Sequence, residues 1–87
     1  GNTGMQESAE ALLGVYPNPA NGKVVNVIAP SIMEQVMVYD AMGRKVMAFG
    51  NINDRMTVIN TDALTNGSYI VEVILSNGDR LRQQLVK

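Results

Sequence analysis

The C-terminal stretch, residues 68–87, reads SYIVEVILSNGDRLRQQLVK and decides the fold. Ser68 to Leu75 is rich in β-branched residues, as is typical of a strand. Asn77-Gly78 follows and favours a type I′ hairpin turn, because both residues tolerate positive φ. Asp79 to Val86 then supplies the return strand. The sequence therefore predicts an antiparallel hairpin at this end of the chain.

The same sequence pattern extends back to Val15. Between Val15 and the hairpin, short β-branched runs alternate with turn residues, and no helical pattern intervenes. Pro30 is expected to end one of these runs, since proline cannot donate to a strand ladder. The further strands expected are Tyr16–Ala20 as an extended edge segment, Lys23–Ala29, Ile32–Tyr39, Arg44–Phe49 and Arg55–Asn60. With the hairpin they make about seven strands. The predicted fold class is all-β, an immunoglobulin-like antiparallel β-sandwich.

Two local features are predicted, and the second supports a sandwich. Asp40 to Gly43 is predicted to form a turn in which Asp40 bonds its own backbone and Gly43 takes the left-handed conformation. Tyr69 stands at the start of a strand, where its hydroxyl can reach back to upstream backbone as a tyrosine corner. The alternative, that Tyr69 is an ordinary strand aromatic, stays open at this point.

The length of 87 residues fits a single domain. Residues 1–14 hold too short an apolar pattern for a stable helix, so we expect a linker or a lead derived from expression, with the domain at residues 15–87. Gly1 in place of an initiator Met suggests a fragment of a longer protein. No apolar run approaches the roughly 20 residues that span a bilayer.

The composition excludes most chemistry. There is no His and no Cys, so the usual general base, the thiolate nucleophile and the common zinc ligands are absent. Glu34 and Glu72 have no second acid nearby in sequence for glycoside hydrolysis. A net charge of −1 with scattered basic residues gives no footprint for nucleic acid. We expect no enzyme activity, catalytic residue, cofactor or metal.

Two binding features remain open. Asn51, Asn53 and Asp54 offer oxygen ligands for calcium, but a full site needs about six to eight oxygens, which favours a plain polar turn. Arg80, Arg82 and Gln84 share one face of the last strand by its period of two. They form either a docking stripe or a solvated outer face whose charges discourage strand pairing.

Four segments, in this order, resemble the C-terminal sorting domain of proteins exported by the type IX (Por) secretion system. They are Tyr16-Pro17-Asn18-Pro19-Ala20, Val38-Tyr39-Asp40-x-x-Gly43-Arg44-x-Val46, Leu64-x-x-Gly67-x-Tyr69-Ile70-Val71 and Leu85-Val86-Lys87. The resemblance implies a signal motif of Pro17, Asn18, Pro19, Asp40, Gly43, Leu64, Gly67, Tyr69, Leu85, Val86 and Lys87. Gln84 and Asn60 depart from the lysine and aspartate that are common in the family at these places.

The resemblance also implies a role. Such domains end larger cargo proteins, which reach the periplasm of a Gram-negative bacterium and are recognised through this domain by an outer-membrane translocon. A sortase-like cysteine peptidase then removes the domain, here in the lead before Val15. The cargo is released from the cell or attached to anionic lipopolysaccharide on its surface. Neither nucleic acid nor membrane insertion is involved.

The mode of recognition is a further hypothesis. The final strand, Asp79 to Lys87, is expected to expose backbone groups that a receptor strand pairs with. The alternative function is an accessory module that binds carbohydrate or protein. It has few aromatics to use, because Trp is absent and most of Tyr16, Tyr39, Tyr69 and Phe49 are expected on core faces.

Overall fold

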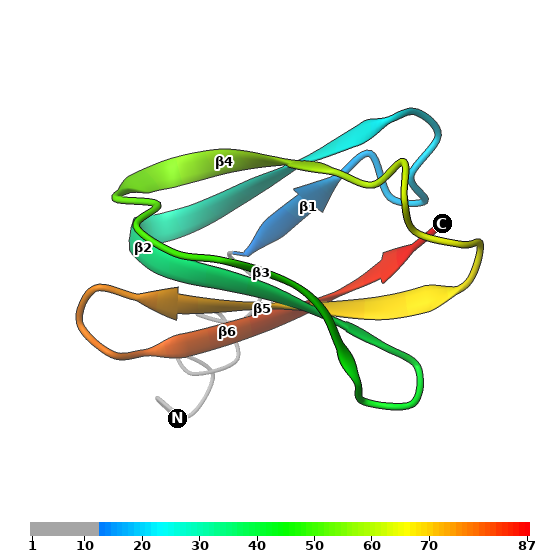
Figure 1. Cartoon of the computed structure of the whole chain (residues 1–87). Helices are drawn as coiled ribbons and strands as arrows, with labels where there is room; N and C mark the ends of the chain where they lie inside the picture. Colours follow the sequence, from blue (N-terminus) through cyan, green and yellow to red (C-terminus); the bar gives the residue numbers. More distant parts are fainter. Residues whose placement is uncertain (1–12) are drawn as a thin grey trace, which may run out of the picture.

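The computed structural model describes residues 13–87. These residues form six strands and no helix, so no helix among them could cross a membrane (Figure 1). The strands are β1 Gly14–Tyr16, β2 Val24–Asp40, β3 Lys45–Phe49, β4 Asp54–Asn60, β5 Ser68–Leu75 and β6 Arg80–Val86. Residues 1–12 of the predicted lead lie outside the described residues.

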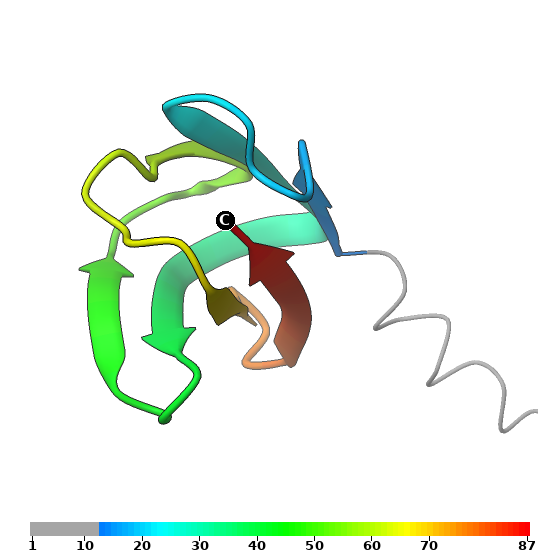
Figure 2. The ribbon, with the colours of Figure 1, turned by 90° about the vertical axis from the view of Figure 1, so that its right-hand side faces the viewer.

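The long strand β2 organises the whole fold. Its first half pairs antiparallel with β1 on one side and β4 on the other. Its second half pairs antiparallel with β3 and β5, and β5 pairs with β6. This gives a layer ordered β1-β2-β4 and a layer ordered β3-β2-β5-β6. Figure 2 shows the two layers facing each other as a sandwich, with β2 passing from one to the other.

Pro30 does not end a strand, and that prediction was wrong. The two strands expected on either side of it are one strand of 17 residues, which is why the count is six rather than seven. The pairing of β2 with β4 shifts register between Ile28 and Met33, so Pro30 stands where no ladder bond is required of it. The irregularity lets β2 bend from one layer into the other.

The core fills the space between the layers. Leu13 is 2% exposed and Gly14 opens β1, so these two residues, which the sequence assigned to the lead, pack with the domain. Strand β1 ends at Tyr16, and the expected extended segment bends there instead; the Tyr16-Pro17 and Asn18-Pro19 bonds are cis. The most deeply buried apolar side chains are Val25, Val27, Met33, Val36, Val38, Ile59, Val71, Val73 and Leu85.

The C-terminal hairpin is confirmed, but its turn type differs from the prediction. The amide of Leu75 donates to the carbonyl of Asp79 at 2.8 Å, and the amide of Gly78 donates to the carbonyl of Leu75 at 2.9 Å. Gly78 has φ of 95°, whereas Asn77 keeps a negative φ. The loop therefore has three residues with glycine in the left-handed position, in place of a two-residue type I′ turn.

Candidate functional site

The predicted signal residues gather at one end of the sandwich. In the ladder, Asp40 of β2 stands opposite Tyr69 of β5, and Tyr69 stands opposite Leu85 of β6. The turn after β2, the start of β5 and the end of β6 therefore share one end of the layer (Figure 1). We define the C-terminal cluster as residues 17–20, 61–69 and 84–87.

Asn18 closes the free edge of β6 within this cluster. Its side-chain amide Nδ2 donates to the carbonyl of Gln84 at 2.7 Å, and its Oδ1 accepts from the amide of Val86 at 3.1 Å. The amide of Ala20 donates to the carbonyl of Val86 at 2.7 Å. One asparagine side chain thus makes the bonds that a neighbouring strand would make. The expectation that the final strand exposes its backbone is wrong for this half.

Lys87 ties the end of the chain to the turn before β5. Its Nζ donates to the carbonyl oxygens of Thr61 and of Leu64, the latter at 2.6 Å. Its backbone exchanges two hydrogen bonds with Gly67, at 2.8 and 3.0 Å. The Thr61 carbonyl also accepts from the amide of Leu64, so the ammonium group adds a second bond there and binds both ends of the turn. Asn60 caps this same turn by accepting from the amide of Asp62 at 2.8 Å, so the departure from aspartate costs no cap.

Tyr69 forms the predicted tyrosine corner. The residue is 6% exposed, and its hydroxyl donates to the carbonyl of Thr65 at 2.6 Å. The ordinary-aromatic alternative is thereby excluded. Leu64 and Leu85 of the signal motif are also buried, at 8% and 0% exposure. Leu64, Tyr69 and Leu85 are therefore the core residues of the motif, and its other members are at least partly exposed.

The Asp40 turn forms as predicted, beside the cluster. Asp40 Oδ1 accepts from the amides of Met42 and Arg44 at 3.0 and 2.9 Å, and Oδ2 lies 2.9 Å from Arg44 Nε. Gly43 takes φ of 86°. The hydrogen bond from the Arg44 amide is the main cause that lowers the pKa of Asp40 below its ordinary 3.8. This carboxylate is held charged to close the turn.

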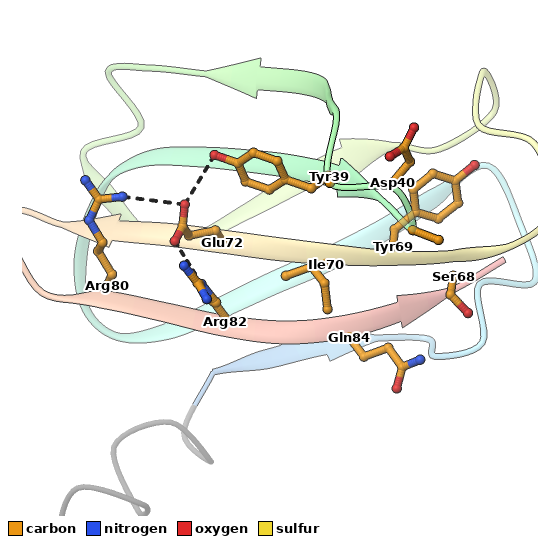
Figure 3. A pocket seen from close by; sticks show the side chains of 11 residues that line it. Tyr39, Asp40, Ser68, Tyr69, Ile70, Glu72, Arg80, Arg82 and Gln84 are labelled. Carbon is orange, nitrogen blue, oxygen red and sulfur yellow. Dashed lines mark hydrogen bonds and ion pairs between the residues drawn. The ribbon is translucent and has the colours of Figure 1, made fainter.

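A second polar arrangement lies on the outer face of β5 and β6. Glu72 is 3% exposed, and its oxygens lie 3.0 Å from Arg82 Nε, 3.6 Å from Arg80 Nη1 and 3.3 Å from the Tyr39 hydroxyl (Figure 3). The side chains of Arg80 and Arg82 remain 62% and 71% exposed, respectively. An open hollow of about 670 Å³ runs from them past Gln84 to the Asp40 turn. The arginines share one face as predicted, but the sequence interpretation missed the acid beneath them.

The remaining candidates do not assemble into a site. Residues 13–87 contain no group of three or more Asp, Glu, His or Cys side chains that could hold a metal ion. Asn51 and Asn53 both have φ of 54°, and Asp54 accepts from the amide of Arg55, as in a polar turn. Tyr16 and Phe49 are 48% and 40% exposed, contrary to the expectation of core positions. They pair with opposite halves of β2 and so form no shared platform.

Comparison with solved structures defines the class of fold. A DUF3244 family protein with an immunoglobulin-like β-sandwich fold from Bacteroides vulgatus gives a TM-score of 0.67 at 15% identity, over 87% of this chain and 83% of that one. CopC from Methylosinus trichosporium gives 0.55 at 20% identity, over 86% and 90%. The CBM51-2 and INT domains of ZmpB from Clostridium perfringens give 0.64 at 15% identity over 78% of this chain, which spans 17% of that one. The predicted immunoglobulin-like sandwich is confirmed.

The family follows from the sequence. The model of the secretion system C-terminal sorting domain matches residues 14–87, and the chain belongs to this family. The resemblance drawn from the four segments is thereby confirmed. No curated protein matches the chain significantly. Membership makes the chain a type IX sorting signal, consistent with a non-catalytic role, and implies export to the cell surface or the extracellular space.

Proposed function

We propose that this domain is the address of a larger cargo protein, recognised by the type IX translocon in the outer membrane of a Gram-negative bacterium. Residues 15–87 are the signal domain, and a sortase-like cysteine peptidase cuts in the lead that precedes them. The domain has no catalytic residue or cofactor of its own. Its partners are the translocon, the peptidase and the covalently attached cargo.

One observation supports the proposal best. Signal residues that lie up to 68 positions apart, Asn18 and Val86, meet at one end of the sandwich through a side-chain bond, and Lys87 bonds Leu64 at the same end. The Asn18 side chain bonds the backbone of Gln84 and Val86, and the Lys87 side chain bonds the carbonyl of Leu64. A signal recognised as a linear tail would need neither contact. We infer that the translocon recognises the C-terminal cluster as a folded surface.

The experiment uses a secreted reporter fused to residues 1–87 in a bacterium with a type IX system. Deletion of residues 83–87 removes half of β6 and should trap the reporter in the periplasm. Lys87→Gln is the sharper variant, because it keeps the ladder with Gly67 and removes the charge that binds the Thr61–Leu64 turn. Arg55→Ala, on an exposed position of β4, is the matched control.

Each outcome is informative once circular dichroism shows that the variant domain is folded. Periplasmic retention of Lys87→Gln with normal delivery of Arg55→Ala supports the C-terminal cluster as the recognised surface. Normal surface delivery of the fusion that lacks residues 83–87 would refute the sorting role itself. Uncut reporter on the surface would refute removal by a peptidase and leave recognition intact.

A further inference from the structure

The N-terminal half of β6 presents an open backbone edge. Hydrogen-bonded pairs alternate along an antiparallel ladder, and the amide of Leu75 bonds Asp79 while Gly67 and Lys87 exchange both bonds. Odd-numbered residues of β6 therefore bond to β5, and even-numbered ones point their amide and carbonyl groups to the other side. Within residues 13–87, that side is closed at Gln84 and Val86 by Asn18 and Ala20. No backbone or side chain of these residues pairs with the outward groups of Arg80 and Arg82.

The side chains at this open edge carry fixed positive charge. Arg80 and Arg82 share the outer face, and Glu72 lies between them and the sheet, held also by the Tyr39 hydroxyl (Figure 3). One buried carboxylate holds both guanidinium groups beside the edge while leaving most of their surface exposed. The three groups together carry a net charge of +1. Each guanidinium has five N–H donors in all, so donors remain for another anion.

We propose that this half of β6 binds an extended peptide segment of a partner protein, added as a strand, with acidic and apolar side chains in alternation. The outward amides and carbonyls of Arg80 and Arg82, with the amide of Gln84, pair with the peptide backbone. Alternate peptide side chains then lie on the outer face, where carboxylates meet the two guanidinium groups. The intervening side chains extend the inner face beside Leu81, which is 5% exposed, and so are apolar.

This binding site is separate from sorting, because it uses no residue of the C-terminal cluster except the outward amide of Gln84. Charge alone would equally attract an acidic polysaccharide or lipid headgroup. The open backbone edge favours a peptide, since only a peptide supplies donors and acceptors at the spacing of a strand. The bonds of Asn18 to Gln84 and Val86 end the available edge, so the bound segment is short.

The test measures fluorescence anisotropy of a labelled peptide, Val-Glu-Val-Glu-Val-Glu-Val with blocked ends, on titration with the full chain. We expect saturable binding that weakens at least about tenfold when Gln replaces Glu in the peptide. A peptide N-methylated at alternate residues, which cannot pair along one edge, should lose binding entirely. Retained binding of the N-methylated peptide would overturn strand addition.

Protein variants locate the site. Arg80→Gln with Arg82→Gln should weaken binding at least about tenfold, whereas Arg44→Gln, an exposed arginine elsewhere, should not change it. Gln84→Pro removes an outward amide without touching the ladder to β5 and should weaken binding, while Gln84→Ala should not. This pair keeps the test valid if loss of both arginines unfolds the domain around Glu72. Binding unchanged in Gln84→Pro, or dextran sulfate binding in place of the peptide, would overturn the proposal.

Discussion

The two halves of β6 are treated differently by the fold. The C-terminal half is covered by β5 and Gly67 on one side, and on the other Asn18 and Ala20 pair with all its outward groups except the amide of Gln84. The N-terminal half pairs only with β5 among the described residues, and its outer face carries Arg80 and Arg82 over Glu72. Edge strands invite unwanted pairing, and proteins manage them with covers or charges. Here a side-chain amide covers one half, and the other half is left open beside arginines.

The residues of the signal motif likewise fall into two groups, one buried in the core and one that bonds chain segments at the surface. Its buried members, Leu64, Tyr69 and Leu85, belong to the core. The side chains of Asn18 and Lys87 instead bond separate chain segments to each other. A substitution of a buried residue lowers the stability of the whole domain. A substitution of Asn18 or Lys87 changes the surface at one end of the sandwich. The variants below separate these effects, from the largest expected change to the smallest.

Leu85→Ala should produce the largest effect. Leu85 is 0% exposed, and removing its branched end leaves a cavity in a small core, so the free energy of unfolding should fall by about 2–5 kcal/mol. Val86→Ala, the next residue on the partly exposed face, should cost less than about 1 kcal/mol. Urea denaturation measures both. Equal losses at the two positions would contradict the division of the motif into core and surface.

Tyr69→Phe tests the tyrosine corner. It removes the 2.6 Å bond to the Thr65 carbonyl inside a closely packed corner, and the free energy of unfolding should fall by about 1–3 kcal/mol. The melting temperature should fall by roughly 4–8 °C per kcal/mol. Tyr39→Phe, whose hydroxyl lies 3.3 Å from Glu72, is the control with a smaller expected loss. An unchanged melting temperature in Tyr69→Phe would show that the corner contributes nothing.

Asn18→Ala tests the closed half of β6. Two bonds to the backbone of Gln84 and Val86 are lost, but solvent reaches both groups, so the cost should be about 1 kcal/mol or less. The matched control is Asn21→Ala, an exposed residue of the same loop with no side-chain bond among the described residues. Thermal melts followed by circular dichroism distinguish them. A control that loses as much stability as Asn18→Ala would contradict a specific role for Asn18.

Asp40 should give the smallest effect, which shows most clearly as a change in the pH dependence of stability. Its pKa is lowered from the ordinary 3.8, so its stabilising contribution is complete above that value and is lost as the pH falls through the folded-state pKa. Asp40→Asn should flatten the fall of melting temperature below about pH 4. An NMR titration of the Asp40 carboxyl group checks the cause. A pKa at or above its ordinary value would contradict it.

The sequence predicted what depends on neighbours in the chain. The strand Ser68–Leu75 and the Asp40 turn formed as expected, because β-branched runs and a short acid before glycine act locally. The bonds from Asn18 to Gln84 and Val86 join residues more than 60 positions apart, and no local pattern carries that pairing. The prediction that Pro30 ends a strand was wrong because proline is excluded only from positions that pair in a ladder, and β2 is unpaired with β4 at Pro30.

The length of the loop between β5 and β6 decides which residue of β6 faces Glu72. A two-residue Asn77-Gly78 turn would place Gln83 opposite Glu72, whereas the three-residue loop places Arg82 there. The ion pair with Glu72 was therefore unpredictable from the dipeptide alone. With a three-residue loop, the strand register places Arg82 opposite Glu72, and that cross-strand acid and base predict the ion pair.

Amide hydrogen exchange of β6, resolved by NMR, tests the account most directly. The amide of Val86 should be protected beyond that of any other even-numbered residue of β6, and Asn18→Ala should remove that protection. The amides of Arg80, Arg82 and Gln84 should exchange fast, while those of Leu81, Gln83 and Leu85 stay protected by β5. Rapid exchange at Val86 in the unaltered protein, or protection at Arg80 and Arg82 equal to that of Leu81, would contradict a strand closed at one half and open at the other.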